Sequence, residues 1–187
     1  MAKKNARNTR GKIVSAAWKL FYEQGYEDTT VEEIIALSGT SKGSFYHYFD
    51  GKDALLSTLS SLFDEKYEEL MDELTPDMTA MDQLLFLNQE LFKMIEDSIS
   101  LDLLARLYST QLTTSGEKHL LDHNRIYYKL LRKIIAKGRE NGQLSRTSGV
   151  SEMVKLYALC ERALLYDWCL CAGEYSLVEY SSRVLPV

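Results

Sequence analysis

Residues 40–48 gather side chains that can bond phosphates and the edges of nucleic-acid bases. The segment reads TSKGSFYHY, so one lysine stands among hydroxyls, a glycine and a histidine. Short side chains let a backbone approach a duplex closely, while hydroxyl, imidazole and ammonium groups bond phosphates and base edges. The pattern predicts a DNA-contacting set that comprises Thr30, Thr40, Ser41, Lys42, Gly43, Ser44, Tyr46, His47, Tyr48 and Lys52.

A short helix and a tight turn must precede this segment if it is to face a duplex. Thr30 followed three residues later by Glu33 is a capping box, which predicts a helix that begins near Val31. Gly39 supplies the permissive backbone that a tight turn between two helices requires. The chain is therefore expected to reverse direction within a few residues.

A second helix is expected to start at Thr40 or Ser41, since either side chain can cap it. Phe45 and Phe49 would turn toward neighbouring helices and hold the second helix in place. The polar side chains between them would then face outward. This is the sequence form of a helix-turn-helix aimed at a DNA major groove.

The first part of the chain, to about residue 55, resembles the DNA-binding domain of the TetR family of one-component repressors. The matching features are Phe21, Gly25, the Thr29-Thr30 pair, Gly39, the Lys42-Gly43 pair and the block from Phe45 to Phe49 that leads to Lys52. Beyond about residue 75 the resemblance rests on helix order alone. The sequence departs from the family pattern at Asp50-Gly51, where Lys-x or Ser-x is frequent in the family. The negative charge of Asp50 weakens the phosphate contacts predicted for Tyr48 and Lys52.

The predicted fold class is all-α, because helical spacing of apolar residues runs almost throughout and no alternating strand-like run occurs. The resemblance implies a three-helix helix-turn-helix domain with a basic arm over residues 1–52. It also implies a helical ligand-binding and dimerisation domain over residues 53–187, with about nine helices in all. The helix-turn-helix is expected to have one helix that begins near Val31 and a second that begins at Thr40 or Ser41. The other expected helices cover about 9–24, 52–75, 78–97, 99–112, 116–140, 149–172 and 176–185.

Charge is distributed unevenly along the chain. The net charge is −5, yet residues 1–55 hold 8 basic and 7 acidic side chains, whereas residues 56–187 hold 14 basic and 20 acidic ones. This balance argues against a protein that coats nucleic acid non-specifically. An N-terminal arm can neutralise phosphates or enter the minor groove through Lys3, Lys4, Arg7, Arg10 and Lys12. A basic terminus that merely keeps the chain soluble is the alternative.

The segment 149–172 carries apolar residues on more than one helical face, which predicts burial from two directions. The resemblance implies that one of those directions is a second copy of the chain, in a homodimer formed through about 149–185. A two-fold dimer would match a pseudo-palindromic operator, with its reading heads about one DNA turn apart.

Aromatic and methionine side chains in the second domain suit an apolar cavity, although each taken singly fits an ordinary core. They are Tyr67, Phe86, Phe92, Met94, Tyr108, Tyr127, Tyr128, Tyr157 and Trp168. The resemblance implies a small-molecule effector in this region, while individual ligand-binding residues stay unassigned. The predicted function is a ligand-responsive DNA-binding transcriptional regulator, a repressor released from its operator when an inducer tilts the 52–75 helix. A regulator controlled by a protein partner, or without a small ligand, is the alternative.

Enzymatic and metal chemistry find little support in the sequence. No set of nucleophile, base and orienting residue is evident, so an all-α enzyme is disfavoured and no cofactor is expected. His119 and His123 are spaced to share a helical face but lack a third ligand, so no metal site is predicted. Cys169 and Cys171 are expected to be free thiols in a cytoplasmic protein without a membrane segment.

Overall fold

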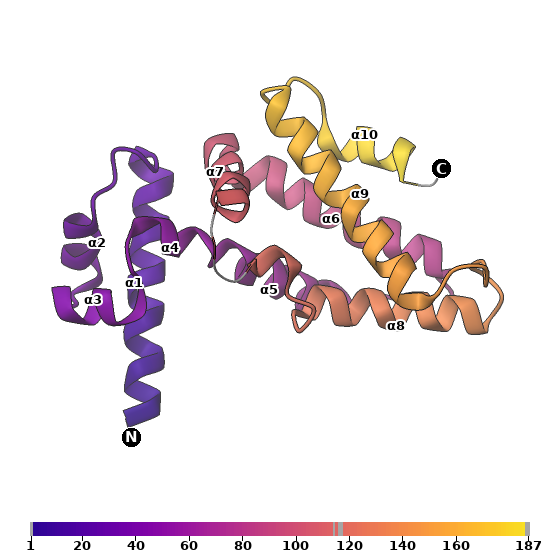
Figure 1. Cartoon of the computed structure of the whole chain (residues 1–187), viewed down its shortest axis with the longest axis horizontal. Helices are drawn as coiled ribbons and strands as arrows, with labels where there is room; N and C mark the ends of the chain where they lie inside the picture. Colours follow the sequence, from indigo (N-terminus) through magenta and orange to yellow (C-terminus); the bar gives the residue numbers. More distant parts are fainter. Residues whose placement is uncertain (1, 114, 116–117, 186–187) are drawn as a thin grey trace. The chain divides into compact units, whose positions relative to one another are not determined.

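The computed structural model describes residues 2–113, 115 and 118–185, with side chains from residue 9 onward, and confirms the all-α prediction for them (Figure 1). The elements are α1 (Ala2–Gln24), α2 (Val31–Ser38), α3 (Lys42–Tyr48), α4 (Lys52–Leu56), α5 (Leu59–Met71), α6 (Ala80–Ser98), α7 (Leu101–Thr113), the 3-10 helix η1 (His119–Leu121), α8 (Ile126–Glu140), α9 (Val150–Leu170) and α10 (Leu177–Val184). Over the described residues, no helix combines the length and the apolar character that crossing a bilayer requires.

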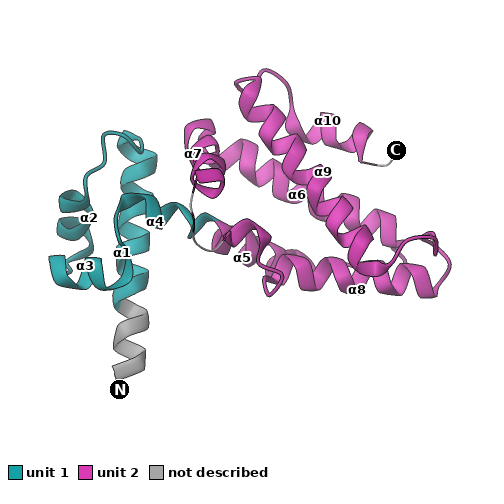
Figure 2. Ribbon diagram, in the orientation of Figure 1, with its two compact units in different colours: residues 1–59 teal, residues 60–187 magenta. Residues whose placement is uncertain are grey.

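The chain forms two compact units, residues 1–59 and residues 60–187 (Figure 2). The first unit contains α1 to α4. The second contains α6 to α10 together with all of α5 except its first residue, Leu59.

The first unit is built around apolar side chains of its first three helices. Ile13, Phe21, Ile34 and Phe45 are almost fully buried, and α1 packs against both α2 and α3. α1 starts at Ala2, earlier than the predicted residue 9. The core of this unit therefore lies behind the surface formed by α2, its turn and α3.

The helix predicted over residues 52–75 is wrong as a single rod, because the chain breaks between α4 and α5 at residues 57–58. Two hydroxyls cause the break. Ser57 Oγ donates to the carbonyl of Ala54 at 2.7 Å, and Thr58 Oγ1 donates to the carbonyl of Leu55 at 2.6 Å while accepting from Trp18 Nε1 at 2.9 Å. Such side-chain bonds compete with the helical backbone ladder. Two helices thus replace one.

The helix predicted over residues 116–140 is also shorter than expected, because α8 begins at Ile126. Asp122 accepts a hydrogen bond from the backbone N–H of Asn124 at 2.8 Å, which forms a turn instead of a helix. The preceding residues His119–Leu121 form a single 3-10 turn.

α6 and α8 meet at very close range in the second unit. A β-carbon built on Gly138 of α8 would lie 2.4 Å from the Cβ of Ala80 on α6, so nothing larger than glycine fits there without movement. Gln143 Oε1 also accepts from the backbone N–H of Ala80 at 3.0 Å. This crossing fixes two of the helices that surround the cavity described below.

Candidate functional site

The start of α2 confirms the predicted capping box. Thr30 Oγ1 accepts from the backbone N–H of Glu33 at 3.2 Å, and Glu33 Oε2 accepts from the backbone N–H of Thr30 at 2.8 Å. The bonds from the Thr30 backbone and side chain lower the pKa of Glu33 below its usual value. α2 then ends at Gly39, whose φ of 63° is the left-handed conformation expected at this turn.

Ser41, and not Thr40, caps α3. Ser41 Oγ accepts from the backbone N–H of Ser44 at 3.1 Å and lies 2.9 Å from Ser44 Oγ. Thr40 Oγ1 instead lies 2.8 Å from Ser38 Oγ at the end of α2. These hydroxyls hold the turn and the first residues of α3 in shape, and Ser41 remains exposed.

α3 separates apolar from polar side chains as the sequence predicted. Phe45 and Phe49 are buried, whereas Tyr46 and His47 are exposed and Tyr48 is half-buried. The rings of His47 and Tyr48 meet edge to face, with 4.8 Å between their centroids. α3 therefore presents hydroxyl and imidazole groups on its outer face.

Gly43 lies on the exposed side of the first turn of α3, and nothing within the unit requires a glycine there. A β-carbon at this position would meet one atom, Ser41 Oγ, at 4.0 Å, which is ordinary contact. Its backbone is helical, and glycine in a helix is less stable than alanine. The missing side chain leaves the backbone of α3 open to close approach from outside.

Lys42 lies beside Gly43 and points its ammonium group toward α2. Its Nζ lies 3.3 Å from Glu32 Oε1, and both side chains are about two-thirds exposed, at 68% and 70%. An exposed pair of this kind contributes little to stability. The ammonium can therefore exchange Glu32 for a phosphate or a base edge at small cost.

Lys52 has a different position from the one that a phosphate contact needs. Its Nζ donates to three backbone carbonyls of the α1–α2 loop, those of Tyr26 at 2.5 Å, Glu27 at 3.2 Å and Thr29 at 2.8 Å. The ammonium also lies 4.3 Å from the centre of the Tyr26 ring. All three of its donors are thus engaged in holding the loop that leads to Thr30.

The basic arm is described in part. Arg10 and Lys12 are exposed on α1, and the guanidinium carbon of Arg10 lies 5.5 Å from the centre of the Phe49 ring. Lys3, Lys4 and Arg7 have side chains outside the described residues. The described part of the arm thus adds positive charge to the unit that carries α3.

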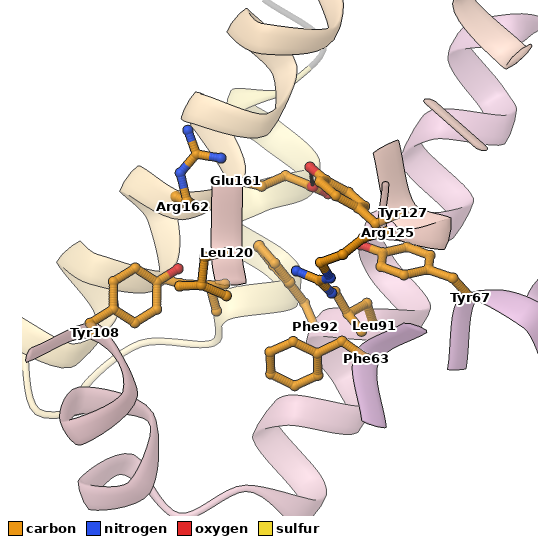
Figure 3. Close-up of a pocket in the computed structure, with 11 residues that line it drawn as sticks. Phe63, Tyr67, Leu91, Phe92, Tyr108, Leu120, Arg125, Tyr127, Glu161 and Arg162 are labelled. Carbon is orange, nitrogen blue, oxygen red and sulfur yellow. Dashed lines mark hydrogen bonds between the residues drawn. The ribbon is translucent and has the colours of Figure 1, made fainter. Parts of the chain in front are cut away.

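The second unit contains a small cavity of about 50 Å³ that opens to solvent (Figure 3). Apolar and aromatic side chains form most of its wall. The lining residues are Phe63, Tyr67, Leu91, Phe92, Tyr108, Leu120, Arg125, Tyr127, Glu161, Arg162 and Leu165. They come from α5, α6, α7, η1, α8 and α9, so six elements must meet to form the cavity.

A buried carboxylate lies in this wall. Glu161 is 5% exposed, and its oxygens accept from Asn88 Nδ2 at 2.8 Å and from the hydroxyl of Tyr127. Burial raises the pKa of Glu161 above its usual value, against the lowering effect of these hydrogen bonds. Burial and the nearby carboxylate likewise raise the pKa of the Tyr127 hydroxyl well above its usual value.

The two arginines of the wall have other partners. Arg125 forms a two-point pair with Asp64, at 3.1 Å from Nε and 2.9 Å from Nη2, and also donates to the carbonyl of Ser60 at 2.9 Å. Arg162 is half-buried and donates to the hydroxyl of Tyr128 at 3.1 Å. Arg125 is therefore neutralised locally, and Arg162 is held by a neutral oxygen.

The sequence analysis predicted some of the residues that line the cavity. Of the nine residues suggested for a cavity, Tyr67, Phe92, Tyr108 and Tyr127 line it, whereas the other five lie elsewhere in the unit. Trp168, for example, donates its indole N–H to the carbonyl of Tyr175. The charged residues were missed, although Glu161 stands in an apolar stretch of the helix predicted to be buried from two sides.

α9 confirms the prediction of a helix with more than one apolar face. Val154, Ala158, Leu164 and Leu165 are buried within the unit. A second set of apolar side chains is exposed, namely Leu156, Leu159, Tyr166 and Leu170. This second set offers a surface for another chain.

Among the described residues, the histidines and cysteines considered as metal ligands do not form a cluster. His119 lies in η1 and His123 in the turn before α8, so they do not share a helical face. Cys160, Cys169 and Cys171 are free thiols.

Sequence similarity to known proteins is strongest in the first unit. Residues 13–59 match the model of the bacterial regulatory proteins of the tetR family. An HTH-type transcriptional regulator encoded in the lacX 3′ region of Lactococcus lactis subsp. lactis is 41% identical over 58 residues, which span 30% of each chain. A fatty acid metabolism regulator protein from Bacillus subtilis strain 168 is 23% identical over 179 residues, or 94% of this chain and 91% of that protein.

A solved structure extends the likeness in fold to both units. The FadR repressor of Thermus thermophilus, crystallised with lauroyl-CoA, gives a TM-score of 0.75 at 22% sequence identity and covers 95% of this chain and 91% of that chain. The matched segment of the family model contains α2, its turn and α3, which carry the exposed polar face described above. Residues 13–59 thus resemble the tetR family of bacterial regulatory proteins in sequence, and the whole chain resembles FadR in fold.

Proposed function

We propose that this protein is a ligand-responsive transcriptional regulator that binds operator DNA through α3 and releases it when a small molecule occupies the cavity of the second unit. The observation that carries the proposal is the outer face of α3, where an exposed lysine and a glycine without any packing role stand among hydroxyls. The match of residues 13–59 to a family of bacterial regulatory proteins supports the same function. The protein would act as a repressor in the cytoplasm.

The residues proposed to contact DNA are those predicted from the sequence, with one change. Thr30, Thr40, Ser41, Lys42, Gly43, Ser44, Tyr46, His47 and Tyr48 form the proposed contact set. Lys52 acts indirectly, because its ammonium holds the three carbonyls that shape the loop before Thr30. Removing Lys52 would therefore disturb the position of α2 without removing a phosphate contact.

A homodimer is proposed to present two copies of α3 to successive major grooves of a pseudo-palindromic operator. The exposed apolar side chains of α9 support this assembly, since a row of such groups on a helix that is already packed on its other side fits a partner helix.

Effector control is proposed to pass through α5. This helix contributes Phe63 and Tyr67 to the cavity wall and follows α4 after a two-residue break. A ligand that prefers one arrangement of α5 shifts the protein toward it, and a swing from 1:99 to 99:1 needs about 5.5 kcal/mol of differential affinity. The B. subtilis and T. thermophilus relatives suggest a fatty acid derivative as one candidate effector.

The experiment that tests the DNA-binding role compares two lysine variants. Lys42→Ala removes the exposed ammonium of α3 and is expected to weaken binding about tenfold or more, since a good base contact is worth ~1–3 kcal/mol. The matched control is Lys19→Ala, because Lys19 is also exposed and forms an i,i+4 pair with Glu23 on α1. Fluorescence anisotropy at fixed salt measures both variants, on a duplex selected from random DNA by the wild-type protein.

Glu32→Gln sharpens this experiment. It frees Lys42 from its 3.3 Å pair and removes a negative charge beside α3, so affinity is expected to rise a few-fold. If Lys42→Ala binds the duplex as well as the wild type does, α3 is not the helix that reads DNA.

A further inference from the structure

The cavity of the second unit holds a carboxylate without a positive partner. Glu161 is buried and accepts from two neutral donors, the amide of Asn88 and the hydroxyl of Tyr127. No ion pair of Glu161 with a side chain occurs within the described residues. A buried carboxylate is stable when it is paired with a cation as well as hydrogen-bonded, so this arrangement is incomplete.

The two arginines of the cavity wall, Arg125 and Arg162, do not form an ion pair with Glu161. Arg125 is committed to Asp64 by two parallel hydrogen bonds, which satisfy both oxygens of that carboxylate. Arg162 donates to the Tyr128 hydroxyl, which itself donates to the carbonyl of Leu120 at 3.0 Å. Arg162 lies near enough to lower the pKa of Glu161 but forms no ion pair with it, so no cation among the described residues contacts the carboxylate directly.

A second acceptor lies next to the first. The side chain of Asn88 donates its amide N–H to Glu161, while its Oδ1 is buried and has no hydrogen-bond partner among the described residues. This oxygen is thus a second acceptor beside Glu161, although Asn88 itself does not line the cavity. The complement of such a site is a group that carries N–H donors and a positive charge.

The rest of the wall defines the other part of the ligand. Figure 3 shows aromatic rings from several helices around the cavity, among them Phe63, Phe92 and Tyr67. Rings of this kind bury apolar groups and attract cations through their faces. A negatively charged ligand would meet the carboxylate of Glu161, and a purely apolar one would cover it without supplying a charge.

We propose that the effector is a lipophilic amine, bound as its ammonium ion, whose charge pairs with Glu161 while its apolar part lies among the aromatic side chains of the cavity. This proposal rests on the function proposed above and names the chemical class of its ligand.

The test uses three probes that differ in one terminal group. They are phenylbutylamine, phenylbutanol and phenylbutanoate, which are cationic, neutral and anionic near neutral pH. Calorimetric titration of the wild-type protein is expected to give at least about tenfold tighter binding of the amine than of the alcohol, because hydrogen bonds to a charged group are strong. The anion is expected to bind more weakly than the alcohol.

Glu161→Gln keeps the size of the side chain but removes its charge and replaces one accepting oxygen with a donating NH2 group. In this variant the preference for the amine over the alcohol is expected to disappear, while binding of the alcohol is retained. Glu152→Gln, at an exposed position on the same helix, is the matched control and is expected to keep the preference. Circular dichroism and thermal unfolding confirm that both variants are folded.

Several results would overturn the proposal. They are equal binding of amine and alcohol, an amine preference that survives Glu161→Gln, tighter binding of phenylbutanoate, or no binding of the amine at all. Lauroyl-CoA is titrated in parallel, with operator release measured by anisotropy. Release by lauroyl-CoA but not by the amine would overturn the amine proposal and leave the proposed function standing. Failure of the unliganded protein to bind any selected duplex would instead remove the proposed function.

Discussion

Two glutamates, one in each unit, show how differently the two units use charge. Glu33 is exposed at the start of α2, and hydrogen bonds from Thr30 lower its pKa. Glu161 is buried in the second unit, and loss of solvent raises its pKa. The first carboxylate caps a helix end in water, whereas the second is buried in the wall of the cavity. The same residue type thus caps an exposed helix end in the first unit and lines a cavity in the second.

Two glycines repeat this contrast. Gly138 is buried where α8 crosses α6, and its missing side chain makes room for Ala80 at a distance too short for any other residue. Gly43 is exposed, and a β-carbon there would fit without strain. The same residue type therefore serves packing in the second unit and access from outside in the first.

Gly138→Ala should have the largest effect on folding. The added methyl group would lie 2.4 Å from the Cβ of Ala80, so α6 and α8 must separate. Forcing extra atoms into a packed contact typically costs about 1–3 kcal/mol of stability. Urea unfolding measures the loss, and Gly149→Ala is the control because nothing lies within 4 Å of that position. Equal stability of the two variants would show that the crossing has more room than the structure gives it.

Glu161→Gln should change the pH dependence of stability in the unliganded protein. Because folding raises the pKa of Glu161, its contribution to stability is fully present below the unfolded value near 4.5 and is lost as pH rises through the folded value. The wild type should therefore lose stability relative to the variant as pH rises above about 4.5. The groups around the carboxylate are Asn88, Tyr67, Tyr127, Tyr157 and Arg162, and the substitution leaves all of them in place.

Urea unfolding at several pH values tests this expectation, with Glu152→Gln as the control on the exposed side of α9. A stability difference between wild type and Glu161→Gln that stays constant with pH would show that the carboxylate is solvated or already paired.

Gly43→Ala should separate stability from DNA binding, with a smaller effect on folding than the two changes above. Alanine in place of an exposed helical glycine is expected to stabilise the first unit by about 0.5–1 kcal/mol. The same methyl group would hold the α3 backbone away from a duplex and weaken operator binding about tenfold, which corresponds to ~1.4 kcal/mol. Thermal unfolding and anisotropy on one preparation measure both. Unchanged DNA affinity would place Gly43 outside the interface.

The first unit could be predicted closely because its signals are local. The Thr30 and Glu33 capping box, the left-handed Gly39 and the burial of Phe45 and Phe49 each depend on neighbours within a few residues. Lys52 is the residue of the first unit whose contacts the local sequence did not predict. Its ammonium bonds carbonyls more than twenty residues away, and no local pattern distinguishes that role from a phosphate contact.

The second unit could be predicted only as a series of helices, because its cavity forms from segments far apart in the chain. Glu161 meets Asn88 across 73 positions, and Arg125 meets Asp64 across 61. Side-chain bonds also account for two of the helix boundaries that were wrong. The hydroxyls of Ser57 and Thr58 interrupt one helix, and the Asp122 turn delays another.

The central claim is that α3 and the residue before α2 form the surface that meets DNA, and amide hydrogen exchange with and without the selected duplex tests it most directly. Peptides that cover Thr30 and residues 40–48 are expected to gain protection when the duplex is added at low salt, and to lose it at high salt because phosphate contacts are salt-dependent. Peptides from α8 should stay unchanged. Protection confined to the second unit, or none in residues 40–48 under conditions where the duplex is bound, would contradict the account.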